Sequence, residues 1–251
     1  IVGNIAIVKF SREEKLKGEL LKVAELSEEQ RKCMLELLNL YFDNVNEEAF
    51  YKDLQDKEWA IILKDSVTGE IRGFSTQTLL DGVIDGVHIK AIFSGDTIID
   101  KNYFGTRELP RVWGRFARSL IKKYKGIKLF WFYISKGYMT YMLMPRYFYE
   151  FFPRYDKEIP EFEKKVLDSL AMKKFGVQYD SKTGILHIKS NYYLKKGVAD
   201  ITAELLKNPH INFFVKQNPG YMLGEELACI TELTEENMKP IFRQIIKEYQ
   251  S

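Results

Sequence analysis

The chain has 251 residues, of which 45 % are hydrophobic and 29 % charged, a balance that excludes an intrinsically disordered protein. Its formal net charge is only +3, from 38 Lys and Arg against 35 Asp and Glu, which argues against a nucleic-acid-binding protein. Aromatic residues make up 14 % of the chain, a content that builds a thick core and can also line an apolar pocket.

Several wider properties follow from the same composition. No apolar run approaches the roughly 18 residues of a membrane span, and the apolar stretch Ile1–Phe10 lacks the charged start of a signal peptide, so it predicts a strand. Cys33 and Cys229 form no paired pattern, which predicts free thiols and a cytoplasmic protein. The three histidines are dispersed, and we expect no metal site. Without a linker or repeat, we expect one domain over residues 1–251.

The first half of the chain predicts two helices followed by an antiparallel meander. The stretch Ser27-Glu28-Glu29-Gln30 is a capping box that opens the first helix, and the second helix is expected after Asn46. Three strands follow, over residues 59–63, 71–78 and 87–99. Turns between them are expected at 65–70, at Asp81-Gly82 and at Asp85-Gly86.

The second half mixes helices and strands. A helix over 109–123, a strand over 127–134 and a helical stretch from Tyr138 form a crossover unit, so the strands on either side of the first helix should be parallel. Further elements are expected as helices at 161–173, 199–206 and 235–249, the last capped by Thr234, a hairpin at 181–184, and strands at 211–215 and 227–231. The predicted fold class is mixed α+β, with one central, mostly antiparallel sheet flanked by helices.

A nine-residue stretch after the meander, Ile99-Asp100-Lys101-Asn102-Tyr103-Phe104-Gly105-Thr106-Arg107, introduces a resemblance. Together with the order of elements, it resembles the GNAT acyltransferase superfamily, in which the fourth strand ends in a pattern like V-x-P-x-Y-R-G-x-G. Ile99, Tyr103 and Gly105 match this pattern, while Lys101, Phe104 and Arg107 replace its proline, arginine and last glycine. The stretches 218–221 and 225–230 resemble late strands of related bacterial proteins, and the resemblance covers most of residues 27–235.

The resemblance implies a GNAT-like N-acyltransferase that takes an acyl group from a pantetheine thioester. In that family, backbone amides at the end of the fourth strand and in the following turn hold the donor. This implies donor-binding roles for Ile98, Ile99, Phe104, Gly105, Thr106 and Arg107. With few glycines the loop approaches a diphosphate less closely, so the phosphopantetheine of an acyl carrier protein fits at least as well as coenzyme A.

The helix after this loop carries its arginines on one face. At about 100° per residue, Arg107, Arg111, Arg115 and Arg118 fall within about an 80° arc opposite the apolar face. We expect the arginines to point outward, with Arg111 and Arg115 contributing to an anion site for the donor's phosphates or for an acidic carrier protein. A solvated helix face and a nucleic-acid-binding stripe are the alternatives.

Acyl transfer to an amine needs a base, a polarised carbonyl and an acid for the departing thiolate. Asp96 lies in an otherwise apolar strand, where burial would raise its pKa toward a useful range, and Gly95 beside it predicts a bulge or a close backbone approach. The resemblance implies a tyrosine acid after the fifth strand, where Tyr141 is the first candidate and Tyr138 the second. For each tyrosine, a place in the core is the alternative.

The methionines near these tyrosines bear on the acyl group. Met139, Met142 and Met144 are interleaved with aromatic residues and could form an adaptable slot for an acyl group longer than acetyl. The predicted acceptor is a small-molecule or peptide amine. A catalytically silent GNAT-like domain that binds a ligand or partner is the alternative function, favoured by Phe104 in place of the loop arginine.

Overall fold

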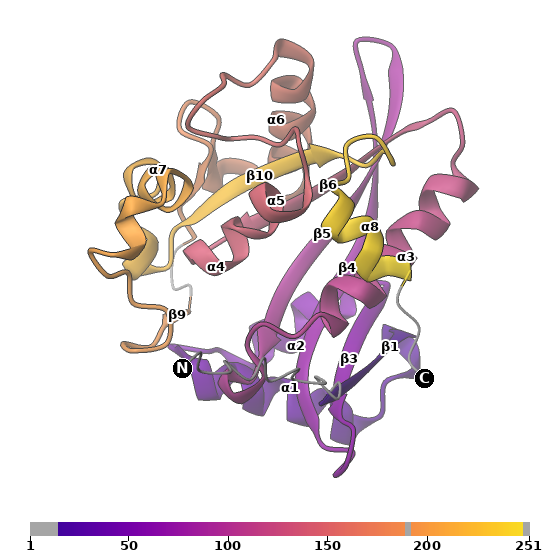
Figure 1. Cartoon of the computed structure of the whole chain (residues 1–251), viewed down its shortest axis with the longest axis vertical. Helices are drawn as coiled ribbons and strands as arrows, with labels where there is room; N and C mark the ends of the chain where they lie inside the picture. Colours follow the sequence, from indigo (N-terminus) through magenta and orange to yellow (C-terminus); the bar gives the residue numbers. More distant parts are fainter. Residues whose placement is uncertain (1–14, 189–191, 248–251) are drawn as a thin grey trace, which may run out of the picture.

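The computed structural model describes residues 15–188 and 192–247 of the chain. Within these ranges, eight strands form one sheet in the order β1-β3-β4-β5-β6-β10-β8-β7 (Figure 1). The strands are β1 Leu16–Lys22, β3 Trp59–Asp65, β4 Ile71–Ile84, β5 Val87–Ile99, β6 Lys128–Ser135, β7 Tyr179–Asp180, β8 Ile185–Leu186 and β10 Glu226–Glu232. A separate short pair joins β2 Phe42–Asp43 to β9 Tyr193–Leu194.

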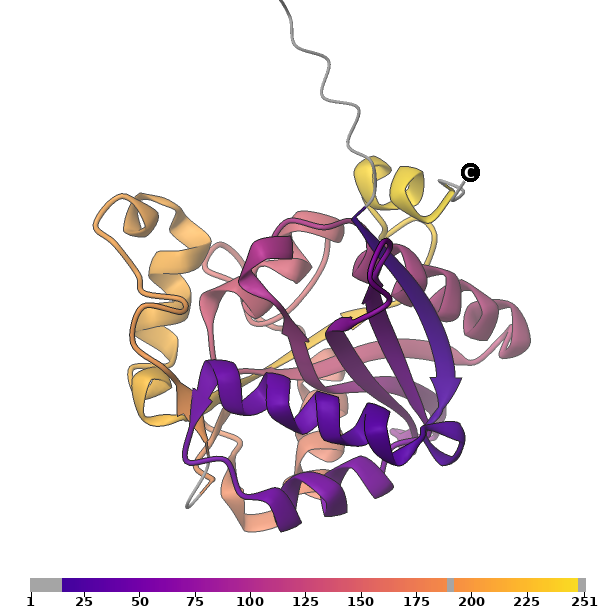
Figure 2. The ribbon, with the colours of Figure 1, turned by 90° about the horizontal axis from the view of Figure 1, so that it is seen from below.

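Helices cover both faces of the sheet. They are α1 Glu28–Tyr41, α2 Glu47–Gln55, α3 Glu108–Lys123, α4 Tyr138–Tyr141, α5 Leu143–Tyr147, α6 Glu161–Phe175, α7 Pro209–Gln217 and α8 Pro240–Lys247. Helices α1, α2 and α6 pack on one face, and α3, α5 and α8 pack on the other, where aromatic side chains dominate the core. Figure 2 shows α1 and α2 side by side on their face, with α3 and α8 across the sheet from them. No helix in the described ranges combines the length and the apolar character that a membrane span requires.

The topology confirms the predicted fold class and the predicted parallel pair. Strands β3, β4 and β5 form the meander, α3 crosses over, and β6 then pairs with β5 in parallel, while every other pairing of the eight-stranded sheet is antiparallel. Local signals also hold: Ser27 caps α1 in a capping box with Gln30, and the Asn46 side chain caps α2. The result is the mixed, mostly antiparallel sheet that the element order predicted.

A bulge interrupts the ladder between β4 and β5, as Gly95 predicted. Ser75 pairs with Thr97 whereas Gln77 pairs with Ser94, so β5 carries one more residue than β4 across this interval. The extra residue shifts the alternation of side chains along β5. As a consequence, Phe93 packs under α6 and Ile98 packs under α1 on the same face of the sheet.

Four secondary-structure predictions are wrong. Asp81-Gly82 forms no turn, because β4 continues through both residues, paired with β5, to the turn at Asp85-Gly86. Residues 211–215 lie in helix α7, which Asn208 caps and Pro209 opens. Residues 199–206 hold only the start of the short 3-10 turn 205–207. The last helix begins at Pro240 rather than at residue 235.

Two further differences concern the N-terminal part. The strand predicted for Ile1–Phe10 lies outside the described residues. The edge strand β1, Leu16–Lys22, has no counterpart among the predicted elements, because its sequence LKGELLK lacks a β-branched residue. It pairs with β3 along its whole length.

Candidate functional site

The parallel strands β5 and β6 separate partway along their length. Their pairing runs from Ile89 and Lys128 to Ser94 and Tyr133, and β5 then continues to Ile99 without β6 beside it. The bulge at Gly95 and Asp96 begins where this pairing ends. On the side of β6, the backbone groups of β5 beyond Ser94 therefore border an opening in the sheet, while β4 remains paired on the other side.

A small cavity lies on the α3 face of this opening, and we call it the tryptophan cavity. Its volume is about 50 Å³, and its lining is mostly apolar. The cavity is bounded by side chains from α3, α5, α8 and the sheet, chiefly Leu109, Pro110, Trp113, Trp131, Leu143, Tyr147 and Phe242. Trp113 and Trp131 contact each other with ring centroids 4.1 Å apart. Such a space suits the apolar part of a ligand.

A chain of hydrogen bonds forms the polar floor of the tryptophan cavity. Trp131 Nε1 donates to Ser94 Oγ (2.9 Å), and Ser94 Oγ donates to Gln77 Oε1 (2.5 Å). Gln77 Nε2 in turn donates to Ser75 Oγ (2.8 Å), which lies 2.7 Å from Thr97 Oγ1. Thr97 Oγ1 donates to the Gly95 carbonyl at 3.3 Å, so the chain ends on the bulge and holds it in place.

A larger cavity lies on the opposite face, against α1, α2 and the end of α6, and we call it the charged cavity. Its volume is about 680 Å³. Its lining combines aromatic rings with ionisable side chains, namely Phe42, Phe50, Phe93, Asp53, Asp96, Lys136, Lys174, Phe175, Tyr192 and Glu226. Gly95, Thr97, Ile134 and Thr140 line both cavities, so the two cavities meet at the opening between β5 and β6.

Asp96 projects from the bulge into the charged cavity. The Tyr192 hydroxyl donates a short hydrogen bond to Asp96 Oδ1. Burial raises the pKa of the Asp96 carboxyl, and the Asp53 carboxylate raises it further, whereas the Tyr192 hydrogen bond and the nearby Lys136 and Lys57 lower it. The carboxyl is thus held in a partly dry site with a raised pKa, as its place in an apolar strand predicted.

Two lysines around Asp96 are already paired with acids. Lys57 is fully buried, and its Nζ pairs with the Asp53 carboxylate and donates to the Asp53 carbonyl at 3.0 Å. Lys136 Nζ lies 2.9 Å from Glu226 Oε1 and 3.6 Å from the centroid of the Tyr192 ring. These two ion pairs link neighbouring segments around the charged cavity. Asp96 itself has no ion pair among the described residues.

The two predicted acid candidates lie away from both cavities. Tyr141 is buried in the core, where its hydroxyl donates to the Pro153 carbonyl at 3.0 Å and burial raises its pKa. Tyr138 is partly buried against the same core. Helix α4 ends at Tyr141 and α5 starts at Leu143, so the chain turns between them and brings a later tyrosine, Tyr147, to the tryptophan cavity.

Tyr147 was not among the residues that sequence reasoning selected. It is only 5 % exposed, its ring packs on Phe242 with centroids 4.8 Å apart, and its hydroxyl has no hydrogen-bond partner among the described residues. Burial raises the pKa of Tyr147, while the positive charges of Arg146 and Arg107 lower it. No local sequence signal separates it from the other tyrosines of this stretch, because the break between α4 and α5 is a feature of the structure.

The prediction of an outward-facing arginine stripe on α3 is wrong. Arg111 is 1 % exposed and forms a buried ion pair with Glu108, whose Oε1 also accepts a hydrogen bond from the Gly18 amide of β1 (2.6 Å). Arg118 Nε and Nη2 each lie 2.6 Å from the Glu235 carboxylate. Arg115 remains exposed, with Nε donating to the Ile246 carbonyl at 3.2 Å. Glu108 lies on the same helix, one turn before Arg111, whereas Glu235 comes from another segment, which a helical wheel of α3 does not include.

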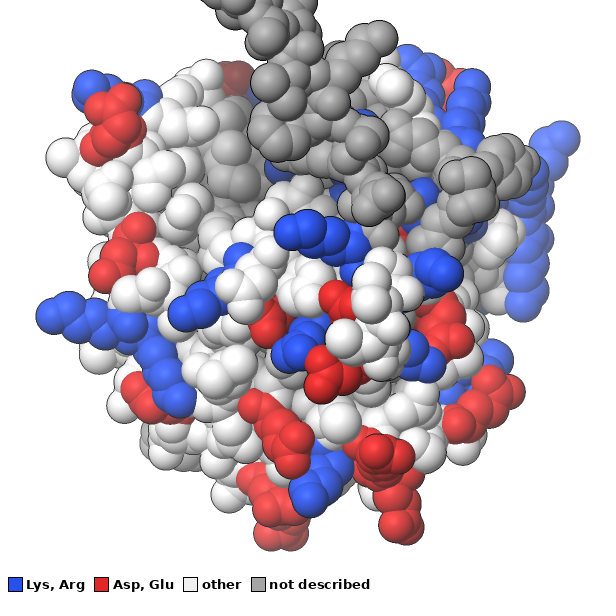
Figure 3. All heavy atoms as spheres, turned by 60° about the horizontal axis from the view of Figure 1, so that its bottom comes forward, with Lys and Arg blue, Asp and Glu red and all other residues white. Residues whose placement is uncertain are grey.

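The face of the molecule that carries α1 and α2 has charges of both signs. Across the lower half of the molecule in Figure 3, acidic and basic side chains are interspersed. This mixture is typical of a solvated face.

The predicted donor loop precedes α3 on the surface. Phe104 is 46 % exposed, Gly105 has φ +81°, and the Thr106 hydroxyl accepts from the Glu108 amide at 3.2 Å. Ile99 packs against the aromatic core on the α3 face of the sheet, whereas Ile98 is buried under α1 on the other face. These residues surround the start of α3, where the buried Glu108 carboxylate opposes a second anion.

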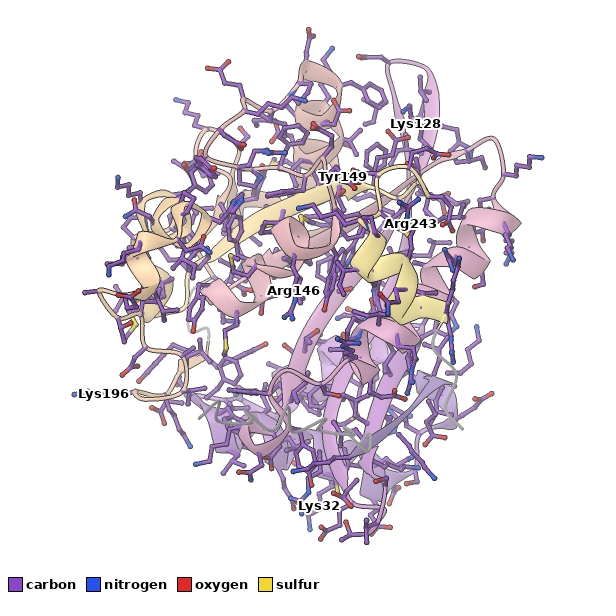
Figure 4. The ribbon with its side chains drawn as sticks, viewed as in Figure 1. Lys32, Lys128, Arg146, Tyr149, Lys196 and Arg243 are labelled. Atoms are coloured by element: carbon purple, nitrogen blue, oxygen red, sulfur yellow. The ribbon has the colours of Figure 1, made fainter. Side chains whose placement is uncertain are left out.

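Two arginines act on Tyr147, which lines the tryptophan cavity. Arg107 stands at the N-cap of α3, and Arg146 on α5 has its guanidinium carbon 5.7 Å from the centroid of the Tyr147 ring. Figure 4 shows Arg146 projecting from α5 toward the start of α3. The positive charge beside the cavity therefore comes from two separate elements.

The methionines of the predicted acyl slot line neither cavity. Met144 is completely buried in the aromatic core, Met142 packs against that core, and Met139 is 37 % exposed. An acyl group longer than acetyl therefore stays a prediction from the sequence.

No protein-family model and no curated protein sequence matches this chain. Among solved structures, it is similar to a GNAT family N-acetyltransferase from Escherichia coli in complex with CoA, at 14 % identity and a TM-score of 0.36, over 51 % of this chain and 67 % of that one. It is similar to Saccharomyces cerevisiae N-myristoyltransferase with bound myristoyl-CoA at 14 % identity and a TM-score of 0.39, over 49 % of this chain and 29 % of that one.

A third similar structure is a conserved protein of unknown function from Enterococcus faecalis, described as a probable N-acyltransferase. The two share 15 % identity with a TM-score of 0.41, over 87 % of this chain and 66 % of that one. Such identities and TM-scores are too low to carry a conclusion about activity or substrate. The strand order, the crossover through α3 and the parallel pair of β5 and β6 agree with the element order that the sequence predicted.

Proposed function

We propose that the protein is an N-acyltransferase that moves an acyl group from a pantetheine thioester to an amine. The observation that carries this proposal is the meeting of two cavities, one on each face of the sheet, at Gly95, Thr97, Ile134 and Thr140. A thioester entering from one face and an amine entering from the other would come together at this opening, and a transfer reaction needs such proximity.

The tryptophan cavity suits the donor. Its apolar lining and its volume of about 50 Å³ suit the thioester end of the donor with a small acyl group, and Arg107 and Arg146 near Tyr147 suit the phosphate groups of the donor. Either acyl-CoA or the acyl-phosphopantetheine of an acyl carrier protein has these features. The edge of β5 that faces β6 is placed to donate to the thioester carbonyl beyond Ser94, because the pairing with β6 ends there and β4 pairs only with the opposite edge.

Asp96 is assigned as the base. It lies in the charged cavity beside the opening, and burial raises the pKa of its carboxyl, which makes the carboxylate a stronger base than an exposed one. The amine nitrogen forms a bond to the thioester carbonyl carbon, Asp96 takes the proton that nitrogen loses, and the carbon–sulfur bond breaks to leave an amide. The acceptor is a small-molecule or peptide amine.

Tyr147 is assigned as the acid. Its hydroxyl faces the tryptophan cavity without a hydrogen bond to the described residues, and two arginines favour the phenolate that remains after it protonates the departing thiolate. The Tyr141 hydroxyl instead donates a hydrogen bond to the Pro153 carbonyl in the core.

One observation favours a second function, a silent domain that binds a ligand without transferring an acyl group. The first turn of α3 carries the buried Glu108 carboxylate, and Phe104 stands where the resembling family has an arginine. Both features weaken a diphosphate site at the helix start.

Acyl transfer is tested by incubating the protein with a panel of amines and with acetyl-, butyryl-, octanoyl- and palmitoyl-CoA, and separately with acyl carrier protein loaded with the same chains. Release of free thiol and a mass gain of the amine by one acyl group are expected for at least one combination. Asp96→Asn should lower the rate by about 10²-fold or more. Thiol release that is independent of every amine, or no transfer from any donor, would leave the silent domain as the better description.

A further inference from the structure

The charged side chains that line the charged cavity are not all paired with one another. Within the described residues, Lys57 pairs with Asp53 and Lys136 pairs with Glu226. The remaining ionisable lining residues are two exposed side chains at the rim, Glu48 and Lys52, and two partly buried ones, Asp96 and Lys174. The unpaired charges inside the cavity are therefore one acid and one base.

Lys174 reaches the cavity from the last turn of α6. Its ammonium lies 4.5 Å from the centroid of the Phe93 ring and 5.7 Å from that of Phe175, and it forms neither an ion pair nor a hydrogen bond within the described residues. The Asp53 and Asp56 carboxylates act on it only at longer range, and Lys57 repels it. An anion brought into the cavity would be the first hydrogen-bond acceptor for this ammonium.

Asp96 provides the complementary group on the sheet side. Its carboxyl accepts from Tyr192 through one oxygen and has no ion pair among residues 15–188 and 192–247. A carboxylate has capacity for further donors, so an ammonium ion near the bulge would find an acceptor there.

We propose that the charged cavity binds an amine that also carries an anionic group, with the amine at Asp96 and the anion at Lys174. Such a ligand would be the acceptor of the proposed acyltransferase. The inference about binding stands without the proposed function, and only the acylation of the bound amine rests on it. The rings of Phe93, Phe175 and Tyr192 lie between and around the two charges, so the part of the ligand that joins its charged ends meets an apolar surface.

The experiment measures binding by isothermal titration calorimetry without any acyl donor. The probes are phenylalanine, β-alanine, 4-aminobutanoate, 6-aminohexanoate and phosphoethanolamine, each compared with the amine that lacks the anionic group. At least one probe is expected to bind about tenfold more tightly than its matched amine, the gain typical of a charge-assisted hydrogen bond. The series of lengths reports the spacing of the two sites, and phosphoethanolamine distinguishes phosphate from carboxylate.

Lys174→Met tests the assignment of the anion site, because methionine keeps an unbranched apolar stem against Phe93 and Phe175. The ratio of the affinity for the anionic probe to the affinity for its matched amine should fall from about ten to about one in Lys174→Met. In Lys174→Arg this ratio should stay near ten. Lys173→Met is the matched control, since Lys173 lies on the same helix turn and donates to the Asp81 carbonyl outside the cavity. Thermal melting verifies that each variant is folded.

Equal affinity for every probe and its matched amine, no binding of any probe, or an advantage that survives in Lys174→Met would overturn this inference. Its failure is distinct from failure of the acyltransferase proposal. A simple amine that is acylated but gains nothing from an anionic group would contradict only the acceptor class. An amino acid that binds through Lys174 and is never acylated would contradict only the transfer.

Discussion

The Tyr192 hydroxyl donates a hydrogen bond to the Asp96 carboxylate across 96 positions of sequence. This bond favours the ionised form of Asp96, while burial and Asp53 favour the protonated form. The balance between these effects sets the pH at which Asp96 can act as a base.

Tyr192→Phe should therefore shift the acidic limb of the pH profile of kcat/KM to higher pH. Loss of a hydrogen bond that favours the carboxylate raises the pKa of Asp96 further. Activity should fall at low pH and recover as the pH rises. The exposed Tyr193→Phe is the control and should leave the profile in place, and a shift of the limb to lower pH in Tyr192→Phe would exclude Asp96 as the titrating base.

Tyr147→Phe should lower kcat by about 10²-fold with little loss of stability, because its hydroxyl faces a cavity and has no described partner. Tyr141→Phe is the matched control. It removes the bond to the Pro153 carbonyl and should cost about 1 kcal/mol in the free energy of unfolding while leaving kcat near that of the wild type. Steady-state kinetics and urea unfolding of both variants decide between the two tyrosines, and the opposite pattern would return the acid role to Tyr141.

Gly95→Ala should disturb both the fold and the site. A Cβ at this position would lie 2.7 Å from Lys57 Cε and 2.7 Å from Thr76 Oγ1, both in crowded, buried surroundings. We expect a loss of about 1–3 kcal/mol in the free energy of unfolding and a lower kcat, since the bulge would have to move. Gly82→Ala is the control in the same hairpin, where the new Cβ would meet only the end of Ile89 at 3.3 Å. Equal effects of the two substitutions on stability and turnover would contradict a special role for the bulge.

Arg146→Met should raise the KM for acyl-CoA several-fold and leave the KM for an acyl-N-acetylcysteamine thioester unchanged. The short thioester lacks phosphate groups, so it cannot interact with the charge that Arg146 places beside Tyr147. Lys32→Met removes a positive charge from the exposed surface of α1, at the lower edge of the molecule in Figure 4, and should change neither KM. A similar rise for both donors would indicate a structural role for Arg146 instead.

Local sequence patterns were enough to predict much of the frame around the site. Side-chain capping by Ser27 and Asn46 depends on residues three positions away, so the starts of α1 and α2 could be read directly. The bounds of β5 and the bulge at Gly95 followed in the same way, from a long apolar run broken by glycine and aspartate. The start of α7 also has a local signal, an N-cap asparagine followed by proline at Asn208-Pro209. The sequence nevertheless predicted a strand there, because the apolar residues of this helix are clustered rather than spaced at helical intervals.

The composition of the site depended on contacts between distant segments. The helical wheel of α3 placed Arg111 outward, but β1 packs against that turn and buries the arginine with Glu108. Because the chain turns between α4 and α5, Tyr147 rather than Tyr141 lines the tryptophan cavity. The sequence by itself therefore determined the order of the main elements from α1 to β6, the parallel pair and the acid in the bulge, because hydrogen-bonding and hydrophobic periodicity act over a few residues. Only the tertiary structure decided which side chains face the opening, since packing brings Tyr192, Lys174 and Asp96 to one cavity from three separate segments.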